Sequence, residues 1–506
     1  MYIINVEGEK MANKCENLIP DIVNPSPDYY CTWQTQLYAT SDGKPLKQRA
    51  CIGEKQLFNK EKPYGWAYFY EKARGDLILV MDDSWDVPLG GNPDYYGFLA
   101  LNEEKFPSFT GNGISNQEAM KLLSDKIKEI GWKALGGWVC AQKCALFPDT
   151  DEEAYFTERL KWAEYAKWGY WKVDWGERLG VFEFRKMLSE LAHQYAPSVV
   201  LENARIKEVI PYSDTYRTYD VPAIMSIPMT IDKMRVFLDI EPVDNEFSGI
   251  INCEDEAYMA AALGCTMGIM RNPYAGCLPN GQPDPSFPDC HRRLKTKMAE
   301  VTRAARWHRI APAFGVDKNN TYFSDEILTD SWQLINTEAE IEAWWLENAL
   351  IKPFVKDGII TKTACSAISR NMPLPKVTPD ENGYVPYVLA SRNPNGVISV
   401  ATCGRTIDRK YWIPKCKVAI EGKNADVIGI FGEYKELVID FGEEVKLSKI
   451  LAQDLAGEYS QDITKMVRIE GNTAIIPGDI IHNIGTSEQE KDDTSEPGMV
   501  VKFFKL

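Results

Sequence analysis

The stretch LILVMDDSWD, residues 77–86, decides the fold class of this chain. Five apolar residues in a row end in a pair of aspartates, which is typical of a strand buried in a parallel sheet with polar residues at its carboxyl end. The stretch YWKVDWGE, residues 170–177, repeats this order. Because parallel strands need covering helices as crossovers, short apolar runs of this kind predict an α/β fold.

Eight strands of this type are predicted, with helices of 3.6-residue period between them. The strands cover residues 31–37, 77–82, 134–140, 170–174, 198–202, 215–219, 249–253 and 266–270. The helices cover residues 116–130, 151–167, 181–194, 254–263 and 291–308. Strands that alternate with helices in this number favour a (β/α)8 TIM barrel over an open doubly wound sheet.

The C-terminal quarter of the chain has a different pattern. Residues 387–403 read as a hairpin with a turn at 393–396, and strand-like runs follow at 417–420, 437–441 and 499–504. This pattern predicts an antiparallel β-sandwich. We expect a catalytic barrel with a short N-terminal extension over residues 1–315 and the sandwich over 376–506, and the domain membership of the connecting segment 316–375 stays open. The charged stretch 487–497 is expected to form an exposed loop.

Composition excludes several classes of partner. The 506 residues include 73 acidic and 57 basic side chains, and the formal net charge of −16 argues against nucleic acid or an anionic membrane as a partner. No stretch approaches the ~20 apolar residues that span a bilayer, and the start of the chain lacks the pattern of a signal peptide, so the chain as given is expected to be cytoplasmic. The twelve cysteines have no disulfide-framework spacing, and four histidines leave a zinc site short of ligands. A homo-oligomer is compatible with the sequence.

The active site of a TIM barrel lies at the carboxyl ends of its strands, so the residues that end each strand carry the functional prediction. A single carboxylate after a strand is more often a helix cap. Acidic and basic side chains end four of the predicted strands, and several such groups at one barrel mouth indicate a binding site. These candidates are Asp82, Asp83, Lys172, Asp174, Glu177, Glu202, Arg205, Arg217 and Asp220.

Tryptophans are interleaved with these charged residues. Carboxylates, lysine and arginine bind sugar hydroxyls, and aromatic rings stack on the C–H faces of sugars, so the mixture suits a carbohydrate ligand. Packing in the core or at the rim is the alternative role for each tryptophan. We favour ligand contact for Trp33 and Trp85 and include Trp138 in the predicted site.

Three motifs, in this order, resemble those of the α-galactosidase clan, chiefly glycoside hydrolase family 27 and its relative family 36. MDDSW, residues 81–85, is similar to the paired aspartates that bind two hydroxyls of the non-reducing sugar. KVD, residues 172–174, looks like the Lys-x-Asp motif that supplies a hydroxyl ligand and the nucleophile. YRTYD, residues 216–220, is similar to the motif in which an arginine precedes the acid/base aspartate. The resemblance implies a retaining glycosidase with Asp174 as nucleophile and Asp220 as general acid/base.

Three details depart from the family's motifs. Ser84 stands where members commonly have Cys or Gly. Arg217 and Asp220 are three residues apart where many members have four, and Asp214 is the nearby competitor for the acid/base role. The fifth strand, which in the family helps to read the substituent at C2 of the sugar, matches no version of that element here, so the sequence does not predict the sugar.

A retaining glycosidase works by double displacement between two carboxyl groups about 5–5.5 Å apart. Asp174 would attack the anomeric carbon, Lys172 would keep it ionised, and Asp220 would begin protonated. The substrate would be an oligosaccharide or glycoside, and no metal or organic cofactor is required. Two alternatives remain: a metal-dependent lyase or isomerase with Mg²⁺ on Asp174 and Glu202, and a catalytically inactive carbohydrate-binding barrel.

Overall fold

The computed structural model describes residues 15–38, 52–60, 65–111, 113–219, 221, 224–270, 297–335, 351–491 and 493–506. Within these ranges eight parallel strands form one sheet in which each strand pairs with the next and β8 pairs with β1. A parallel bridge between Asn252 and Thr266 joins β7 to the segment before β8, so the ring is closed and the predicted TIM barrel is confirmed. The strands are β1 (Tyr29–Cys31), β2 (Ile78–Met81), β3 (Ala134–Val139), β4 (Tyr170–Val173), β5 (Val200–Asn203), β6 (Thr215–Arg217), β7 (Ile250–Asn252) and β8 (Gly268–Ile269).

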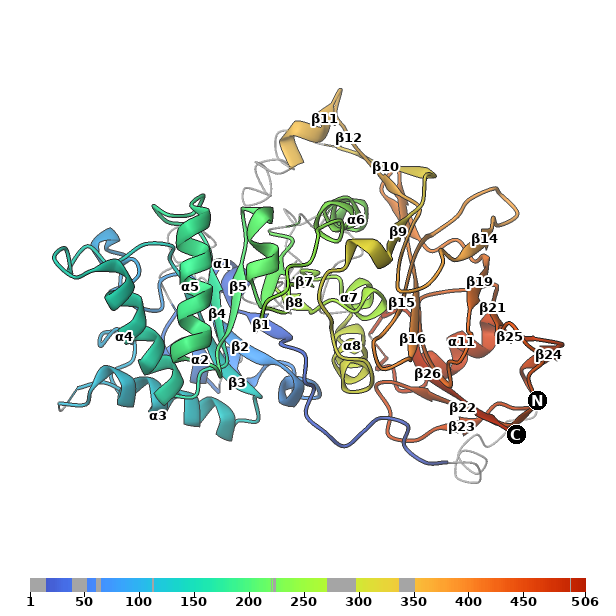
Figure 1. Ribbon diagram of the computed structural model, residues 1–506, viewed down its shortest axis with the longest axis horizontal. Helices are drawn as coiled ribbons and strands as arrows, with labels where there is room; N and C mark the ends of the chain where they lie inside the picture. Colours follow the sequence, from blue (N-terminus) through green and yellow to red (C-terminus); the bar gives the residue numbers. More distant parts are fainter. Residues whose placement is uncertain are drawn as a thin grey trace.

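Helices cover the outside of the barrel (Figure 1). The Ser115 side chain accepts a hydrogen bond from the Glu118 backbone N–H and caps α3, and Asp151 caps α4 in the same way through Ala154. Residues 291–296 of the predicted helix 291–308 lie outside the described ranges. The helices are α3 (Asn116–Glu129), α4 (Glu152–Tyr165), α5 (Phe182–Tyr195), α6 (Ser226–Phe237), α7 (Ala257–Leu263) and α8 (Met298–Ile310).

The first barrel strand lies earlier than predicted. The expected strand at 31–37 is wrong, because β1 ends at Cys31 and the next residues form the helix α1 (Trp33–Tyr38). Strand β1 pairs with β2 from Tyr29 onward, and Tyr29 and Tyr30 are both fully buried. The stretch WQTQLY, residues 33–38, therefore forms a helix that follows β1 and not a strand.

Two further sheets pack face to face in the C-terminal part and form the predicted sandwich. The pairing is mostly antiparallel, and the expected hairpin is present as β15 and β16, but β13 with β15, β16 with β20, and β19 with β21 are parallel pairs. The larger sheet contains β9 (Thr321–Phe323), β13 (Ala367–Arg370), β15 (Tyr387–Arg392), β16 (Ile398–Cys403), β20 (Val427–Phe431), β22 (Leu447–Asp454), β23 (Gln461–Asp462) and β26 (Gly498–Lys505). The smaller sheet contains β14 (Lys376–Thr378), β19 (Lys417–Glu421), β21 (Glu436–Asp440), β24 (Arg468–Glu470) and β25 (Thr473–Pro477).

The connecting segment, whose membership the sequence left open, contributes to the larger sheet of the sandwich and also forms a small sheet of its own. Strand β9 pairs with β13 at the edge of the larger sheet. The next strands, β10 (Ile327–Gln333), β11 (Val355–Lys356) and β12 (Ile359–Cys365), form a separate sheet that we call the arm. Figure 1 shows the arm extending from the sandwich over α6. The side chains of Trp332 and Ile360 pack there against Val221 and Met225, in the segment that follows β6.

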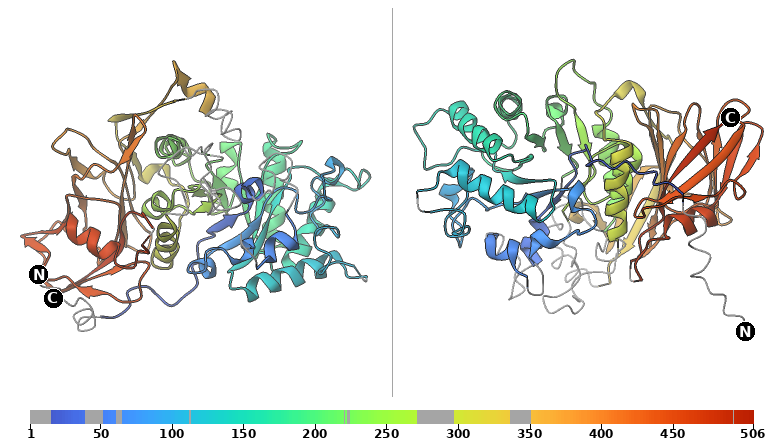
Figure 2. Two further views of the ribbon diagram at one scale, coloured as in Figure 1. Left: turned by 180° about the vertical axis from the view of Figure 1, so that it is seen from behind. Right: turned by 90° about the horizontal axis from the view of Figure 1, so that it is seen from below.

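The barrel and the sandwich share a buried seam. Helices α7 and α8 contact the larger sheet, and the views in Figure 2 place α8 between the two parts. Arg303 of α8 forms a two-pronged ion pair with Asp454, with both side chains buried. The predicted exposed loop 487–497 is wrong at its end, because Ser495 is buried and the Glu496 carbonyl accepts hydrogen bonds from Tyr258 and Arg303. No helix within the described ranges is long and apolar enough to cross a membrane.

Candidate functional site

Charged side chains from alternate strands of the barrel meet at its carboxyl end. Asp82 follows β2, Lys172 lies on β4, Asp174 follows β4, and Arg217 ends β6. All four are at least nine-tenths buried. Because parallel strands bring their carboxyl ends to one face of the barrel, these predicted site residues lie together as expected.

Asp174 is held by two donors. Trp138 Nε1–H donates to Asp174 Oδ2 at 3.0 Å, and Arg217 Nη2 lies 2.6 Å from Asp174 Oδ1. Burial alone would raise the pKa of Asp174, but the charges of Arg217 and Lys172 outweigh burial and lower the pKa to about 2. Asp174 is therefore ionised at every ordinary working pH.

Gly176 fixes the loop that carries Asp174. Its φ of +145° is accessible to glycine, and a Cβ there would lie 2.7 Å from the Ala141 backbone. The Ala141 N–H donates to the Trp175 carbonyl at 2.8 Å, so the loops after β3 and β4 support each other.

Lys172 and Asp82 form a buried ion pair beside Asp174. Lys172 Nζ donates to Asp82 Oδ2 at 2.7 Å, and the Cys31 thiol donates to the same oxygen at 2.9 Å. Burial and the charge of Arg217 act against the ammonium form, yet the carboxylates of Asp82 and Asp174 raise the pKa of Lys172. The lysine therefore keeps its charge and adds a positive neighbour to Asp174.

Asp83 follows in a tight turn. Its backbone N–H donates to Asp82 Oδ1 at 2.8 Å, and Ser84 Oγ donates to Asp83 Oδ1 at 2.9 Å. Ser84 has a φ of +73°, a conformation that glycine adopts at little cost. The turn holds both carboxylates of the MDDSW motif inside the mouth.

Glu202 lies deeper than predicted from its place at a strand end. Tyr170 donates to it at 2.8 Å, Asn252 donates at 2.7 Å, and Tyr29 is within 3.3 Å. Burial raises the pKa of Glu202. Its register partner is Lys172, so it lies at the level below Asp174 and supports the site from inside the barrel.

Arg217 lies at the centre of three carboxylates. Besides Asp174, its guanidinium is 3.7 Å from Glu202 and 3.6 Å from Glu254. Sequence reasoning missed Glu254 and Asn252, although NCED after the seventh strand repeats the acid-ending pattern of the second and fourth. The arginine thus orders the Asp174 carboxylate and balances charge that would otherwise be buried and unpaired.

The predicted tryptophans have different surroundings. Trp85 is 1% exposed, packs on Trp168, and donates its indole N–H to the Trp138 carbonyl, so it is a packing residue and the preference for ligand contact was wrong. Gly137 makes room for Trp85, because a Cβ there would lie 3.1 Å from its Nε1. Trp138 touches Asp174 from below, and Trp33 is half-buried beside β1.

Glu177 and Arg205 are the predicted site residues at the rim. Both side chains are exposed. The Glu177 backbone N–H donates to Gln142, and the Arg205 guanidinium stacks 4.1 Å from the centre of the Tyr219 ring. Neither side chain contacts Asp174, so any role in binding concerns the outer part of the mouth.

The acid/base candidate Asp220 lies outside the described residues. Its competitor Asp214 precedes β6 and therefore lies at the opposite end of the barrel. There Asp214 binds His193 Nε2 at 2.6 Å and accepts the Leu201 N–H at 2.9 Å. Asp214 also lines a hollow of about 520 Å³ at the amino-terminal face, away from Asp174.

The residues do not fit the metal-dependent alternative. Asp174 and Glu202, its two proposed ligands, are both within 3.7 Å of the Arg217 guanidinium, which competes with a divalent cation. Within the described ranges, no group of three or more His, Cys, Asp and Glu side chains is arranged to hold a metal ion.

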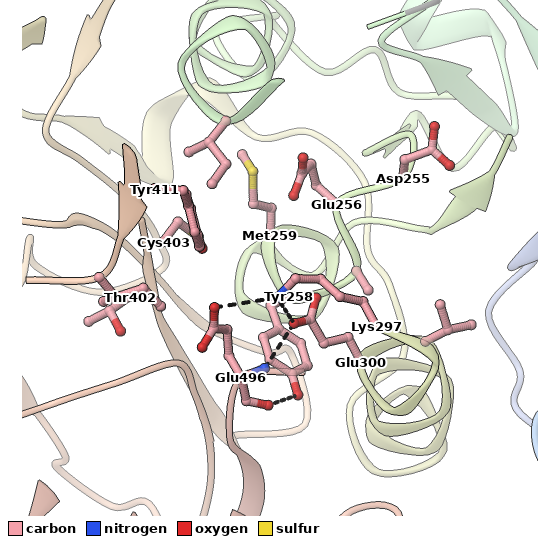
Figure 3. Close-up of a pocket in the computed structure, with 14 residues that line it drawn as sticks. Asp255, Glu256, Tyr258, Met259, Lys297, Glu300, Thr402, Cys403, Tyr411 and Glu496 are labelled. Atoms are coloured by element: carbon pink, nitrogen blue, oxygen red, sulfur yellow. Dashed lines mark hydrogen bonds and ion pairs between the residues drawn. The ribbon is translucent and has the colours of Figure 1, made fainter. Parts of the chain in front are cut away.

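A separate cavity lies at the seam between barrel and sandwich. Figure 3 shows Glu256, Lys297, Glu300 and Glu496 around it, with Lys297 bound to Glu300 and Glu496. Its volume of about 40 Å³ holds a few waters and is too small for a sugar ring. The cavity is therefore not a candidate for the substrate site.

Comparison with family models and with curated proteins found no match. Among solved structures, α-galactosidase I from Mortierella vinacea is similar, with a TM-score of 0.41 and 10% identity over 96% of this chain and 98% of that one. A GH27 β-L-arabinopyranosidase from Geobacillus stearothermophilus has a TM-score of 0.40 and 10% identity over 95% and 97%. An α-galactosidase from Saccharomyces cerevisiae has a TM-score of 0.38 and 11% identity over 97% of each chain.

Proposed function

We propose that this chain is a retaining glycoside hydrolase that releases a terminal α-galactoside-like sugar, with Asp174 as nucleophile and Asp220 as general acid/base. The observation that carries the proposal is the charge of the Asp174 carboxylate together with its contacts. Its carboxylate is ionised and fixed by Trp138 and Arg217, next to the Lys172–Asp82 pair at the mouth of a TIM barrel. A carboxylate of this kind is suited to attack an electrophilic carbon.

The reaction follows from two carboxyl groups with different charges. Asp174 attacks the anomeric carbon while Asp220 gives its proton to the glycosidic oxygen, so the C–O bond to the leaving group breaks and a glycosyl ester forms. Asp220 then takes a proton from water, and the water oxygen attacks the same carbon and releases Asp174. Two displacements give net retention of configuration.

The paired aspartates supply the sugar-binding part of the proposal. Asp82 and Asp83 are fixed by Lys172, Cys31 and Ser84, so their carboxylates can hold hydroxyls at fixed positions without first losing freedom. Asp82 also forms an ion pair with Lys172, so the ammonium group of Lys172 lies within reach of the same sugar.

A panel of 4-nitrophenyl glycosides tests the proposal. It should include the α-galactoside, β-L-arabinopyranoside, α-N-acetylgalactosaminide and α-glucoside, with release of nitrophenol as the measurement. We expect activity on at least one of them, unchanged by exhaustive EDTA. Complete inactivity on the panel would support the carbohydrate-binding alternative, and activity lost on chelation would support the metal-dependent one.

Asp174→Asn tests the nucleophile. The substitution removes the attacking charge, so turnover should fall roughly 10³-fold or more. It also leaves Arg217 with one carboxylate fewer, so the control is Asp454→Asn, which weakens another buried Arg–Asp pair far from the mouth. The control should lose stability and keep its turnover below its melting temperature. An Asp174→Asn variant with wild-type turnover contradicts the assignment.

A further inference from the structure

Arg205 and Arg217 meet at one aromatic ring. Their guanidinium carbons lie 4.1 and 4.6 Å from the centre of the Tyr219 ring. Arg217 is buried and contacts the nucleophile Asp174 at 2.6 Å, whereas Arg205 is exposed at the rim. One tyrosine ring therefore separates Arg205 from the group that touches the reacting centre.

Three other cations at or near the mouth are paired with carboxylates. Lys172 is paired with Asp82 at 2.7 Å, Arg217 with Asp174, and Arg178 at the rim with Glu152 at 3.3 Å. Arg205 differs, because within the described residues its guanidinium has neither a hydrogen-bond acceptor nor a carboxylate within ion-pair distance. Stacking occupies the face of a guanidinium and leaves its N–H donors, which lie in its plane, available to a ligand.

The backbone that presents this pair is strained. Arg205 has a φ of +76° and Tyr219 a φ of +62°, values that side chains other than glycine rarely adopt. Each such residue costs of order 1–3 kcal/mol and persists where the surrounding structure imposes it, most often at functional sites. Two strained residues in contact at the barrel mouth indicate that this stack is held for a ligand.

We infer that Arg205 selects substrates that carry an anionic group, a carboxylate or a sulfate ester, close to the bond that is cleaved. This inference rests on the proposed function and adds the class of substrate. A planar guanidinium with unused N–H donors binds such groups through two parallel hydrogen bonds. A neutral hydroxyl would gain no comparable charge attraction, while the acidic site around Asp82 and Asp83 would repel an anion that had no such partner.

The anionic group can lie on the sugar or on the leaving group. A binding experiment tests the first position, and a hydrolysis experiment tests the second. Calorimetric titration of the wild-type protein with galactose, galacturonate and galactose 6-sulfate measures recognition on the sugar itself. Hydrolysis of an α-galactoside whose aryl leaving group does or does not carry a carboxylate measures recognition on the leaving-group side. In one of these two arms, the anionic member should be favoured roughly tenfold or more.

Arg205→Gln is the decisive variant and Arg178→Gln its matched control. Both remove one exposed guanidinium from the same face of the barrel, but only Arg205 lacks a carboxylate partner. The preference for the anionic ligand should disappear in Arg205→Gln and should persist in Arg178→Gln. Raising the salt concentration should weaken the wild-type preference, since the pair is exposed.

The outcomes distinguish this inference from the proposed function. Wild-type protein that binds neutral and anionic ligands of both arms equally overturns the role of Arg205, even if neutral galactosides are hydrolysed. Equal losses in the two variants would overturn it as well, because the effect would then be general charge at the mouth. Absence of all hydrolysis would count against the proposed function, while the titrations would still decide whether Arg205 binds anions.

Discussion

Two buried aspartates show how neighbours set the charge of a single residue. Asp174 and Asp86 are both removed from water, which by itself favours the neutral form. Arg217 and Lys172 reverse this effect at Asp174 and lower its pKa to about 2. Asp86 accepts a hydrogen bond from the Leu99 N–H but has only a weak charge partner, and burial raises its pKa to about 7.

Asp86→Asn should change the pH dependence of stability. The folded protein keeps the Asp86 proton where the unfolded chain has released it, so this residue lowers the free energy of unfolding progressively as pH rises from about 4 to about 7. The variant lacks this loss and should gain stability relative to wild type across that range, by an amount on the order of a few kcal/mol at pH 8. Urea unfolding of both proteins from pH 4.5 to pH 8 measures the difference. A difference that does not vary with pH would show that Asp86 is ionised in the folded state.

The proposed role of Asp220 as the acid depends on the direction in which β6 runs. Asp220→Ala should abolish hydrolysis of alkyl glycosides, whose leaving groups need a proton, yet spare formation of the glycosyl-enzyme from a dinitrophenyl or fluoride donor. Added azide should then restore turnover and give a glycosyl azide of retained configuration, because a small anion can occupy the space of the carboxylate.

Asp214→Ala is the control for this experiment. Asp214 binds His193 and the Leu201 N–H at the amino-terminal end of β6, so its loss should lower stability without changing the dependence on the leaving group. Azide rescue in Asp214→Ala, with Asp220→Ala like wild type, would contradict the assignment of the acid.

At the scale of elements, the sequence predicted best those strands that are followed by a charged residue. Strand β4 lies within one residue of its predicted bounds: it begins at Tyr170 as predicted and ends one residue before Asp174. The first strand was misplaced, because the predicted range 31–37 omits Tyr29 and Tyr30 and covers residues that form the helix α1. Helix α6 was not predicted; Pro228 lies in its first turn, and Ser226 and Thr230 are polar residues on its buried side.

The predicted site was also only partly accessible from the sequence. The short motifs predicted Asp82, Lys172, Asp174 and Arg217 as site residues, and the structure places these four side chains together at the barrel mouth. Sequence alone could not show that Trp85 is internal, since the space for it depends on Gly137 of a different strand. Glu202 looked like a mouth residue because the depth of a side chain depends on pairing register.

The arm links the sandwich to the segment that precedes α6. Ile360 of β12 is buried against Val221, Ile224 and Met225, which follow β6 and the proposed acid. Ile360→Ala opens a cavity there at a cost of about 2–5 kcal/mol. Because the cavity loosens the segment beside the acid, kcat for an alkyl galactoside should fall more than kcat for the dinitrophenyl galactoside.

Ile439→Ala provides the matched comparison for the arm. Ile439 is equally buried, but it lies in the core between the two sheets of the sandwich. This variant should lose similar stability while the ratio of the two kcat values stays at the wild-type level. Identical ratios in both variants would show that the arm does not position the acid.

At the scale of the whole molecule, the buried seam joins helices α7 and α8 of the barrel to the larger sheet of the sandwich. Arg303 of α8 donates to Asp454 at 2.8 and 3.0 Å and also bonds Tyr258 and the Glu496 carbonyl. One buried guanidinium therefore joins α7 and α8 to β22 and to the segment that precedes β26. The start of the described chain adds a second link, since the Leu18 N–H donates to Gln453 of β22.

Arg303→Met should therefore destabilise both parts of the molecule together. It leaves the Asp454 carboxylate buried without its cation, which costs about 3–5 kcal/mol. Urea unfolding followed by far-ultraviolet circular dichroism and by tryptophan fluorescence should show one transition, shifted equally in both signals, because Trp307 and the sandwich strands share the seam. In the Arg303→Met, Asp454→Asn double variant the loss should be smaller than the sum of the single losses, since the uncompensated charge is gone. Two separate transitions, with only the sandwich shifted, would show that the two parts fold independently despite the buried pair.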